Sequence, residues 1–277
     1  MMTTMELALE VREAGDEHGG AILALARQDV VLNAFIIYDW LRLRNRCRFY
    51  VALRGPKGPL EGVCVIYPDE RFNSVVFCGS PEGIRAILTH IRPRRAVLPR
   101  VGPEELDVVL EALGPGVGPI YDALLMTCGP DDFTPRVAHD VVRLGPEHAE
   151  LFARLWAERE DRRRAVTLEQ ARRALSDPNR PVFAIIKSGR IVSLATIYLS
   201  MPEVSLVGGV YTVPELRGRG LATSVTSRAT EEALRSSELA ALIVRADNAP
   251  AIRVYEKVGY RPYKRLKWVC VGVDYPP

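Results

Sequence analysis

Short apolar runs alternate with amphipathic stretches along the whole chain. In the first half, several runs are rich in β-branched and aromatic residues and are bounded by Gly, Pro and Asp, which is typical of strands. We expect strands at residues 49–53, 60–67, 74–78, 96–98 and 122–127, and helices at 81–91 and 103–113. Strands that alternate with helices predict an α/β fold.

The second half repeats this order of elements. It predicts strands at residues 137–144, 182–187, 191–199, 204–212, 239–245 and 263–273. It predicts helices at 146–159, 221–236 and 250–258, and a further helix that opens at Thr167. Gln170 stands three residues after Thr167, as in a capping box.

An internal repeat links the two halves. The pair Ile66-Tyr67 lies 131 residues before Ile197-Tyr198, and a fixed offset is the mark of repeated units. Residues 128–135 are rich in Gly, Pro and Asp, which indicates a linker. We therefore predict two similar α/β domains, residues 1–133 and 134–277. The alternative is that two unrelated α/β domains share this strand order by chance.

Composition narrows the classes of function. The chain has 277 residues, 48% of them hydrophobic, which is typical of a globular protein. Its formal net charge of only +3 does not indicate a basic surface for binding nucleic acid. Five cysteines lack a C-x-x-C pair and four histidines are scattered, so we expect no metal site and a reducing compartment. No leader or membrane span is evident, and a cytoplasmic protein is predicted. The arginines of residues 159–164 are interpreted as a solvated helix end or loop, and the alternative is a role in recruiting an acidic acceptor.

The informative segment is G-G-V-Y-T-V-P-E-L-R-G-R-G, residues 208–220. A strand is followed by a loop containing Gly218 and Gly220 and then by a helix. Amides at a helix start, together with Arg217 and Arg219, suit a phosphate or pyrophosphate. The alternative is a solvated turn with two surface arginines. Neither a P-loop nor a dinucleotide-binding glycine motif is present.

Two motifs resemble a known family. Arg217-x-x-Gly220-x-Ala222 resembles the R/Q-x-x-G-x-G/A signature of the GNAT superfamily of acyl-CoA-dependent N-acetyltransferases. The segment N-A-P-A-I-R-V-Y-E-K-V-G-Y, residues 248–260, resembles its second signature. The resemblance covers residues 136–277. The sequence of residues 211–214 is similar to that of the corresponding segment in glycine N-acyltransferase-type domains.

The resemblance implies a fold and a cofactor. It implies two tandem GNAT-like domains, each a mixed, mostly antiparallel twisted sheet flanked by helices, with acetyl-CoA bound in the second. A strand backbone would pair with the pantetheine arm, and the loop amides would hold the pyrophosphate. The implied cofactor-binding residues are Tyr211, Thr212, Val213, Arg217, Gly218, Arg219, Gly220, Leu221, Ala222 and Asn248. Asn248 also has an alternative role as a helix cap before Pro250.

The resemblance also implies the catalytic groups. Tyr255 matches the tyrosine near the thioester sulfur, where a phenol can donate a proton to a thiolate; alternatively, it packs on the sheet. The position that often carries a base is Leu206, which cannot act as one. Glu203 is the nearest acid, but alternation along a strand places it on the other face unless a bulge intervenes.

The sequence leaves the acceptor open. The implied reaction is direct attack by an amine, on a small molecule or a peptide, upon the thioester in a ternary complex. Residues 79–85 lack a phosphate loop, so the first half is interpreted as a degenerate GNAT-like domain that binds no CoA. Its predicted role is to form one side of the acceptor cleft or a homodimer surface. Because position 206 carries leucine instead of an acid, a non-catalytic acyl-CoA-binding regulatory module is the alternative function. We expect no nucleic acid or membrane partner.

Overall fold

The computed structural model describes residues 8–69, 72–159 and 166–274. Its contacts divide the chain into two compact units. Unit 1 comprises Met1–Leu124, Arg245–Asp247 and Lys264–Pro277, and unit 2 comprises Leu125–Val244 and Asn248–Tyr263. This division differs from a single cut after residue 133, because the last strand of the chain packs with unit 1.

Unit 1 is a mixed, mostly antiparallel sheet flanked by helices. Its elements are β1 (Leu9–Glu13), α1 (Gly19–Ala26), α2 (Ala34–Arg42), β2 (Arg48–Arg54), β3 (Leu60–Tyr67), β4 (Asn73–Gly79), α3 (Pro81–Ile91), β5 (Ala96–Val101) and α4 (Leu106–Leu113). Strands β1 to β4 pair antiparallel in chain order, and β4 pairs parallel with β5. The core includes Ile84, Ile87 and Leu88 of α3, packed with apolar residues of the strands.

Two long strands contribute residues to both units. They are β6 (Val117–Cys128) and β12 (Arg261–Val271). Within unit 1, β12 pairs antiparallel with β5, from Lys267 opposite Val101 to Val271 opposite Ala96. The last predicted strand therefore forms, and it completes the sheet of unit 1.

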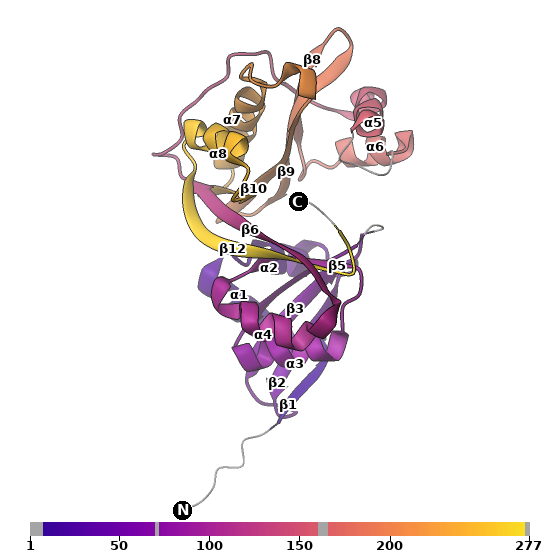
Figure 1. Ribbon diagram of the computed structural model, residues 1–277, viewed down its shortest axis with the longest axis vertical. Coiled ribbons are helices and arrows are strands. Elements are labelled where there is room, and N and C mark those ends of the chain that lie inside the picture. Colours follow the sequence, from indigo (N-terminus) through magenta and orange to yellow (C-terminus); the bar gives the residue numbers. More distant parts are fainter. Residues whose placement is uncertain (1–7, 70–71, 160–165, 275–277) are drawn as a thin grey trace, which may run out of the picture. The chain divides into compact units, whose positions relative to one another are not determined.

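Unit 2 repeats the strand pattern of unit 1. Its elements are β7 (Val142–Arg143), α5 (Ala149–Glu158), α6 (Leu168–Leu175), β8 (Val182–Lys187), β9 (Arg190–Ser200), β10 (Val204–Thr212), α7 (Leu221–Leu234), β11 (Leu239–Arg245) and α8 (Ala249–Val258). Strands β7 to β10 pair antiparallel in order, and β10 pairs parallel with β11. Helices α7 and α8 lie on one side of β9 and β10, and α5 and α6 lie on the other (Figure 1).

The predicted elements of unit 2 form with one exception. The expected strand at residues 137–144 is wrong over most of its length, because only Val142–Arg143 is a strand. The amides of Arg136 and Ala138 instead donate to the hydroxyls of Ser227 and Ser224 on α7. The capping box at Thr167 and Gln170 is confirmed, with hydrogen bonds of 2.9 and 3.2 Å between backbone amides and side-chain oxygens.

Candidate functional site

The predicted glycine loop has a conformation that favours glycine. After β10 the chain makes a short 3-10 turn, Pro214–Leu216, and then reaches α7 through residues 217–220. Gly218 has φ 77° and Gly220 has φ 78°, both in the left-handed region that side chains disfavour. Residues 217–220 are all exposed. The loop therefore presents its backbone to solvent at the start of a 14-residue helix.

The amides at this helix start lack partners. Gly220 caps α7 without any side-chain hydrogen bond. Within the described part of the chain, the amides of residues 218–223 have no acceptor outside the helix. Unpaired amides and the positive end of the helix dipole form an anion-binding site. The structure therefore provides donors where a pyrophosphate is predicted to bind.

The loop side chains are held at two points. The Nε of Arg217 donates to the carbonyl of Thr212 at 3.2 Å, which folds the arginine back over the end of β10. The Nε2 of His139 lies 2.9 Å from the carbonyl oxygen of Arg219. The sequence analysis did not identify His139, because an isolated histidine in a connecting segment carries no motif. Leu221 is buried beneath the loop, and Ala222 is half-buried in the first turn of α7.

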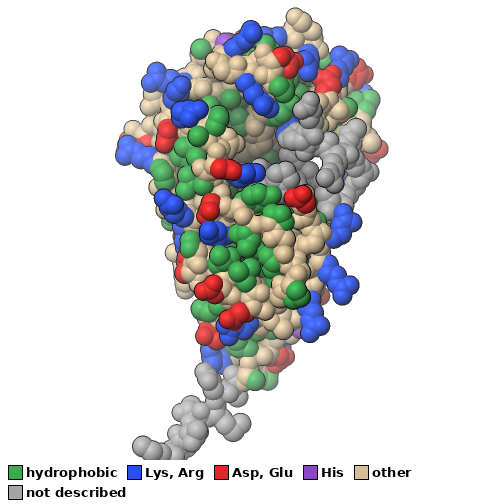
Figure 2. All heavy atoms as spheres, viewed as in Figure 1, with side chains coloured by type: hydrophobic (Ala, Val, Ile, Leu, Met, Phe, Trp, Pro, Cys, Tyr) green, Lys and Arg blue, Asp and Glu red, His purple; other side chains and the backbone are tan. Residues whose placement is uncertain are grey.

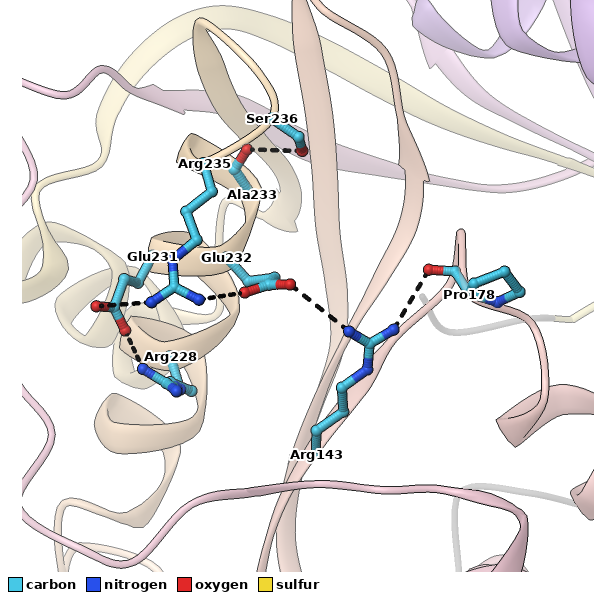
Figure 3. Close-up of polar contacts among 8 residues, drawn as sticks. All are labelled: Arg143, Pro178, Arg228, Glu231, Glu232, Ala233, Arg235 and Ser236. Atoms are coloured by element: carbon cyan, nitrogen blue, oxygen red, sulfur yellow. Dashed lines mark hydrogen bonds and ion pairs between the residues drawn. The ribbon is translucent and has the colours of Figure 1, made fainter.

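The far end of α7 is fixed by a network of ion pairs (Figure 3). Arg235 is paired with Glu231 and Glu232, and Glu232 also lies 3.6 Å from Arg143 of β7. Arg143 in turn donates to the carbonyl of Pro178. These contacts join the helix to the strand β7 and to the segment after α6, so the helix that carries the glycine loop is anchored at its opposite end.

Strand β10 is interrupted beside the loop. Its parallel register with β11 runs from Val204 opposite Leu239 to Leu206 opposite Ala241, although both strands continue further. Its pairing with β9 shifts between Leu206 and Val207 and again between Gly208 and Tyr211. The strand therefore bulges where it leaves β11, which exposes backbone groups along one edge.

The three predicted strand residues, Tyr211, Thr212 and Val213, differ in the direction of their backbone groups. The amide of Val213 donates to the carbonyl of Val192 on β9 at 3.0 Å, so it is not free for a ligand. Successive residues of a strand direct their amides to opposite edges, so Thr212 directs its backbone away from β9. The contact of Arg217 with the Thr212 carbonyl lies on that same edge. Thr212 is therefore the strand residue best placed to pair with a ligand arm.

The second motif builds the ends of α8. The Oδ1 of Asn248 accepts the Ala251 amide at 3.2 Å, so Asn248 caps the helix as in the alternative reading. Gly259 ends the helix at φ 111°, and a Cβ there would lie 2.1 Å from the carbonyl oxygen of Asp132. Tyr260 is 2% exposed, and its hydroxyl bonds to that of Thr230 at 2.9 Å. Much of this motif is thus explained by folding, and the side-chain nitrogen of Asn248 donates to none of the described residues.

Tyr198 packs on the bulge of β10, and its phenol acts electrostatically on Tyr255 of α8. Tyr255 on α8 is 7% exposed, and its hydroxyl makes no hydrogen bond to the described residues. Burial, with a smaller contribution from Tyr198, raises the pKa of Tyr255 to about 12. The Tyr198 ring lies on Gly208 and Gly209, where added Cβ atoms would be 2.6 Å away from its atoms. Tyr198 was missed because it stands in an apolar strand and resembles an ordinary core residue.

Substitution of Gly208 by alanine is expected to displace the Tyr198 ring. The new Cβ would lie 2.6 Å from Cε2 of that ring, so we expect a loss of about 1–3 kcal/mol in the free energy of unfolding. Denaturant unfolding measures this change. Gly20→Ala is the control, because Gly20 is helical with open space around it, and it should be neutral or slightly stabilising. Equal losses in the two variants would contradict the packing role of Gly208.

The predicted base lies far from these tyrosines along the strand. Glu203 is in the turn before β10, and its carbonyl accepts the Leu239 amide. Leu206 is 3% exposed and lies between Leu199 and Ala241. The register shifts follow Leu206, so they do not bring Glu203 to the face of that residue. Glu203 as a base stays a prediction that the geometry does not favour.

Arg159, which follows α5, lies against one aromatic ring of α5 and one of β10. The guanidinium of Arg159 lies 4.1 Å from the ring centroid of Tyr211 and 4.8 Å from that of Trp156. Arg159 is 6% exposed, so its interpretation as part of a solvated end is wrong. The rest of the arginine run, residues 160–164, lies outside the described residues. Figure 2 shows basic and acidic side chains mixed over the face that it draws.

The described residues hold no group of three or more His, Cys, Asp or Glu side chains placed for a metal ion. All five cysteines are free. Among the described helices, none has the length and apolar character needed to cross a membrane.

Comparison with known proteins relates this geometry to a family. Residues 185–269, which include the glycine loop and α8, match the family model of FR47-like proteins. A comparison with curated proteins gives no match. The match to the family model therefore includes the part of unit 2 that carries the glycine loop and α8.

Solved structures resemble the chain over most of its length. A GCN5-related N-acetyltransferase from Sphaerobacter thermophilus is 17% identical with a TM-score of 0.64, and each chain is covered to 97%. A tandem GNAT protein from the clavulanic acid biosynthesis pathway is 18% identical with a TM-score of 0.60, covering 97% of this chain and 100% of that one. A Drosophila protein is 17% identical with a TM-score of 0.69, covering 94% and 98%. At these identities the likeness is one of fold.

Proposed function

This chain has the GNAT fold, and from that premise we propose that unit 2 is an acyl-CoA-dependent N-acetyltransferase. The observation that carries the proposal is the start of α7. Left-handed glycines and unpaired amides meet there beside the bulged edge of β10. Acetyl-CoA, when bound, would supply an acetyl thioester and a diphosphate.

The residues of unit 2 fit this group. The amides of residues 218–222 would bind the diphosphate, and the exposed Arg217 and Arg219 would add positive charge. The open edge at Thr212 would pair with the pantetheine arm, and Asn248 would donate its side-chain amide. Tyr211 stays a predicted cofactor residue that the geometry does not favour, since its ring is stacked with Arg159 and its carbonyl accepts the Ser193 hydroxyl of β9.

The reaction needs a donor for the departing sulfur. A tyrosine keeps its proton at neutral pH, and burial raises the pKa of Tyr255 further, to about 12. Its hydroxyl, which makes no hydrogen bond to the described residues, would donate to the sulfur. The amine that attacks must lose a proton; Leu206 cannot accept it, and the geometry does not favour the predicted base Glu203. We therefore propose that a neutral amine binds directly or that water removes the proton.

A non-catalytic acyl-CoA-binding module is the second candidate. The buried Leu206, where a base is often found in the family that the sequence resembles, favours it. The two candidates differ in turnover, because the module would bind acetyl-CoA but release no thiol.

Calorimetric titration with acetyl-CoA, followed by a thiol-release assay across an amine panel, tests the proposal. An acetyltransferase should bind acetyl-CoA and release thiol only when an acceptor amine is present. Binding without thiol release from any amine would favour the module. A lack of binding would refute both candidates.

A further inference from the structure

The segment before β7 lies along helix α7 as a strap, residues 134–139. Its backbone amides donate to two side chains of the helix: Arg136 to the Ser227 hydroxyl at 2.8 Å, and Ala138 to the Ser224 hydroxyl at 3.1 Å. Both serines are fully buried, and a buried hydroxyl is costly unless it is hydrogen-bonded, so these contacts fix the position of the strap. The later strap residue meets the earlier helix residue, so the strap runs toward the start of α7.

His139, at the end of the strap, reaches the glycine loop. Its Nε2 lies 2.9 Å from the carbonyl oxygen of Arg219. A carbonyl oxygen can only accept, so Nε2 carries a proton and is the donor. The ring is half-buried and lines a cavity of about 350 Å³ between the strap and α7. Because packing leaves room on that side of the ring, the hydrogen bond to Arg219 is what holds the ring against the loop.

This hydrogen bond fixes one peptide plane of the loop. In a trans peptide the carbonyl and the following amide point in opposite directions, and the described residues contain no cis peptide. The carbonyl of Arg219 is directed at His139, so the amide of Gly220 is directed away from it. That amide has no acceptor in the described part of the chain. The contact therefore presents an unpaired donor on the side of the loop opposite the histidine.

Glycine makes this peptide plane easy to turn. Rotation of the plane changes ψ of Arg219 and φ of Gly220, and glycine adopts either sign of φ readily. Gly220 has φ 78°, and Gly218 on the other side of Arg219 has φ 77°. A turned plane would direct the carbonyl oxygen of Arg219, instead of the Gly220 amide, at the proposed diphosphate and repel it. The loop thus needs an outside contact that keeps its donor presented, and His139 supplies one.

We propose that His139 is a positioning residue for the diphosphate: its ring holds the Arg219 carbonyl so that the Gly220 amide faces the ligand. The inference rests on the function proposed for unit 2, and it makes the strap a part of the cofactor site. The donated hydrogen bond is the essential feature, so a different side chain that can donate from the same position should serve as well. A role in packing alone would depend on the ring and not on its proton.

Calorimetric titration of the full chain with acetyl-CoA tests the proposal through three variants. His139→Leu should raise the Kd about tenfold, because the Gly220 amide is no longer held toward the diphosphate. His139→Gln should keep the Kd within about threefold of the wild type, since its side-chain amide can donate from nearly the position of Nε2. His148→Leu is the matched control and should bind as the wild type does. His148 is also a half-buried histidine of unit 2, and it accepts a backbone amide, that of Gly145 ahead of α5.

Thermal unfolding of the same variants separates damage to the fold from loss of the site. His139→Leu and His148→Leu should both lower the Tm slightly, and only His139→Leu should weaken acetyl-CoA binding. An unchanged Kd in His139→Leu overturns this inference and leaves the proposed function standing, whereas a wild type that does not bind acetyl-CoA refutes the proposed function and this inference with it. Equal losses of affinity in His139→Leu and His139→Gln, or in His139→Leu and His148→Leu, also overturn it, because the donated hydrogen bond would then not be the cause.

Discussion

Gly220→Glu is expected to abolish acetyl-CoA binding. The residue has φ 78°, which costs a side chain about 1 kcal/mol or more, and the new carboxylate would stand among the amides that are proposed to hold the diphosphate. Repulsion between like charges and the loss of these donors should weaken binding by at least about 100-fold. Calorimetric titration of the variant with acetyl-CoA measures the change.

A second glycine separates backbone strain from the loss of the site. Gly189 also has a left-handed φ, of 69°, and it lies in the turn between β8 and β9 with nothing near its Cβ position. Gly189→Glu should therefore carry similar strain and the same added charge, yet bind acetyl-CoA as the wild type does. If both variants bind equally well, the start of α7 does not hold the diphosphate.

Tyr255→Phe is expected to lower kcat by about 10- to 100-fold, with little change in the KM for acetyl-CoA. The substitution removes the hydroxyl that would stabilise the departing thiolate and leaves the ring in place. Because the pKa of Tyr255 is raised to about 12, the phenol keeps its proton below that pH, and a fall in rate at lower pH has another origin. Steady-state thiol release across pH measures both quantities.

Tyr260→Phe is the matched control for this effect. Its ring centroid lies 6.0 Å from that of Tyr255, but its hydroxyl is bonded to Thr230 in the interior. We expect a loss of about 1 kcal/mol in the free energy of unfolding and an unchanged kcat. If Tyr255→Phe leaves kcat unchanged while binding persists, Tyr255 is a packing residue and the non-catalytic module becomes the better account.

Apolar runs bounded by turn residues predicted several elements together with their ends. Strands β3, β10 and β11 and helix α3 have the predicted bounds, because their apolar residues are interrupted by turn residues at both ends. The sequence analysis missed α1, whose residues GGAILALA are nearly all apolar and start with two glycines. Such a segment has no polar face, so its spacing does not distinguish a helix from a strand.

The sequence predicted the candidate site only where the backbone conformation limits which residue types can occupy a position. Gly220 stands in the motif because its left-handed φ favours glycine, and the neighbouring Gly218 has a similar φ. Tyr198, His139 and Arg159 act through contacts made across the fold, and nothing local in the sequence distinguishes them from core or surface residues. Asn248 and Gly259 show the opposite case, since their places in a motif are explained largely by the start and end of α8.

The path of the final strand has a consequence for synthesis on the ribosome. The partner of β5 is β12, which follows all the strands from β7 to β11 in the chain. Most of unit 1 is therefore translated first, yet β5 lacks this partner strand until the strands of unit 2 have been synthesised. A polypeptide that stops before β12 would leave the edge of β5 exposed, and an exposed strand edge can pair with another chain.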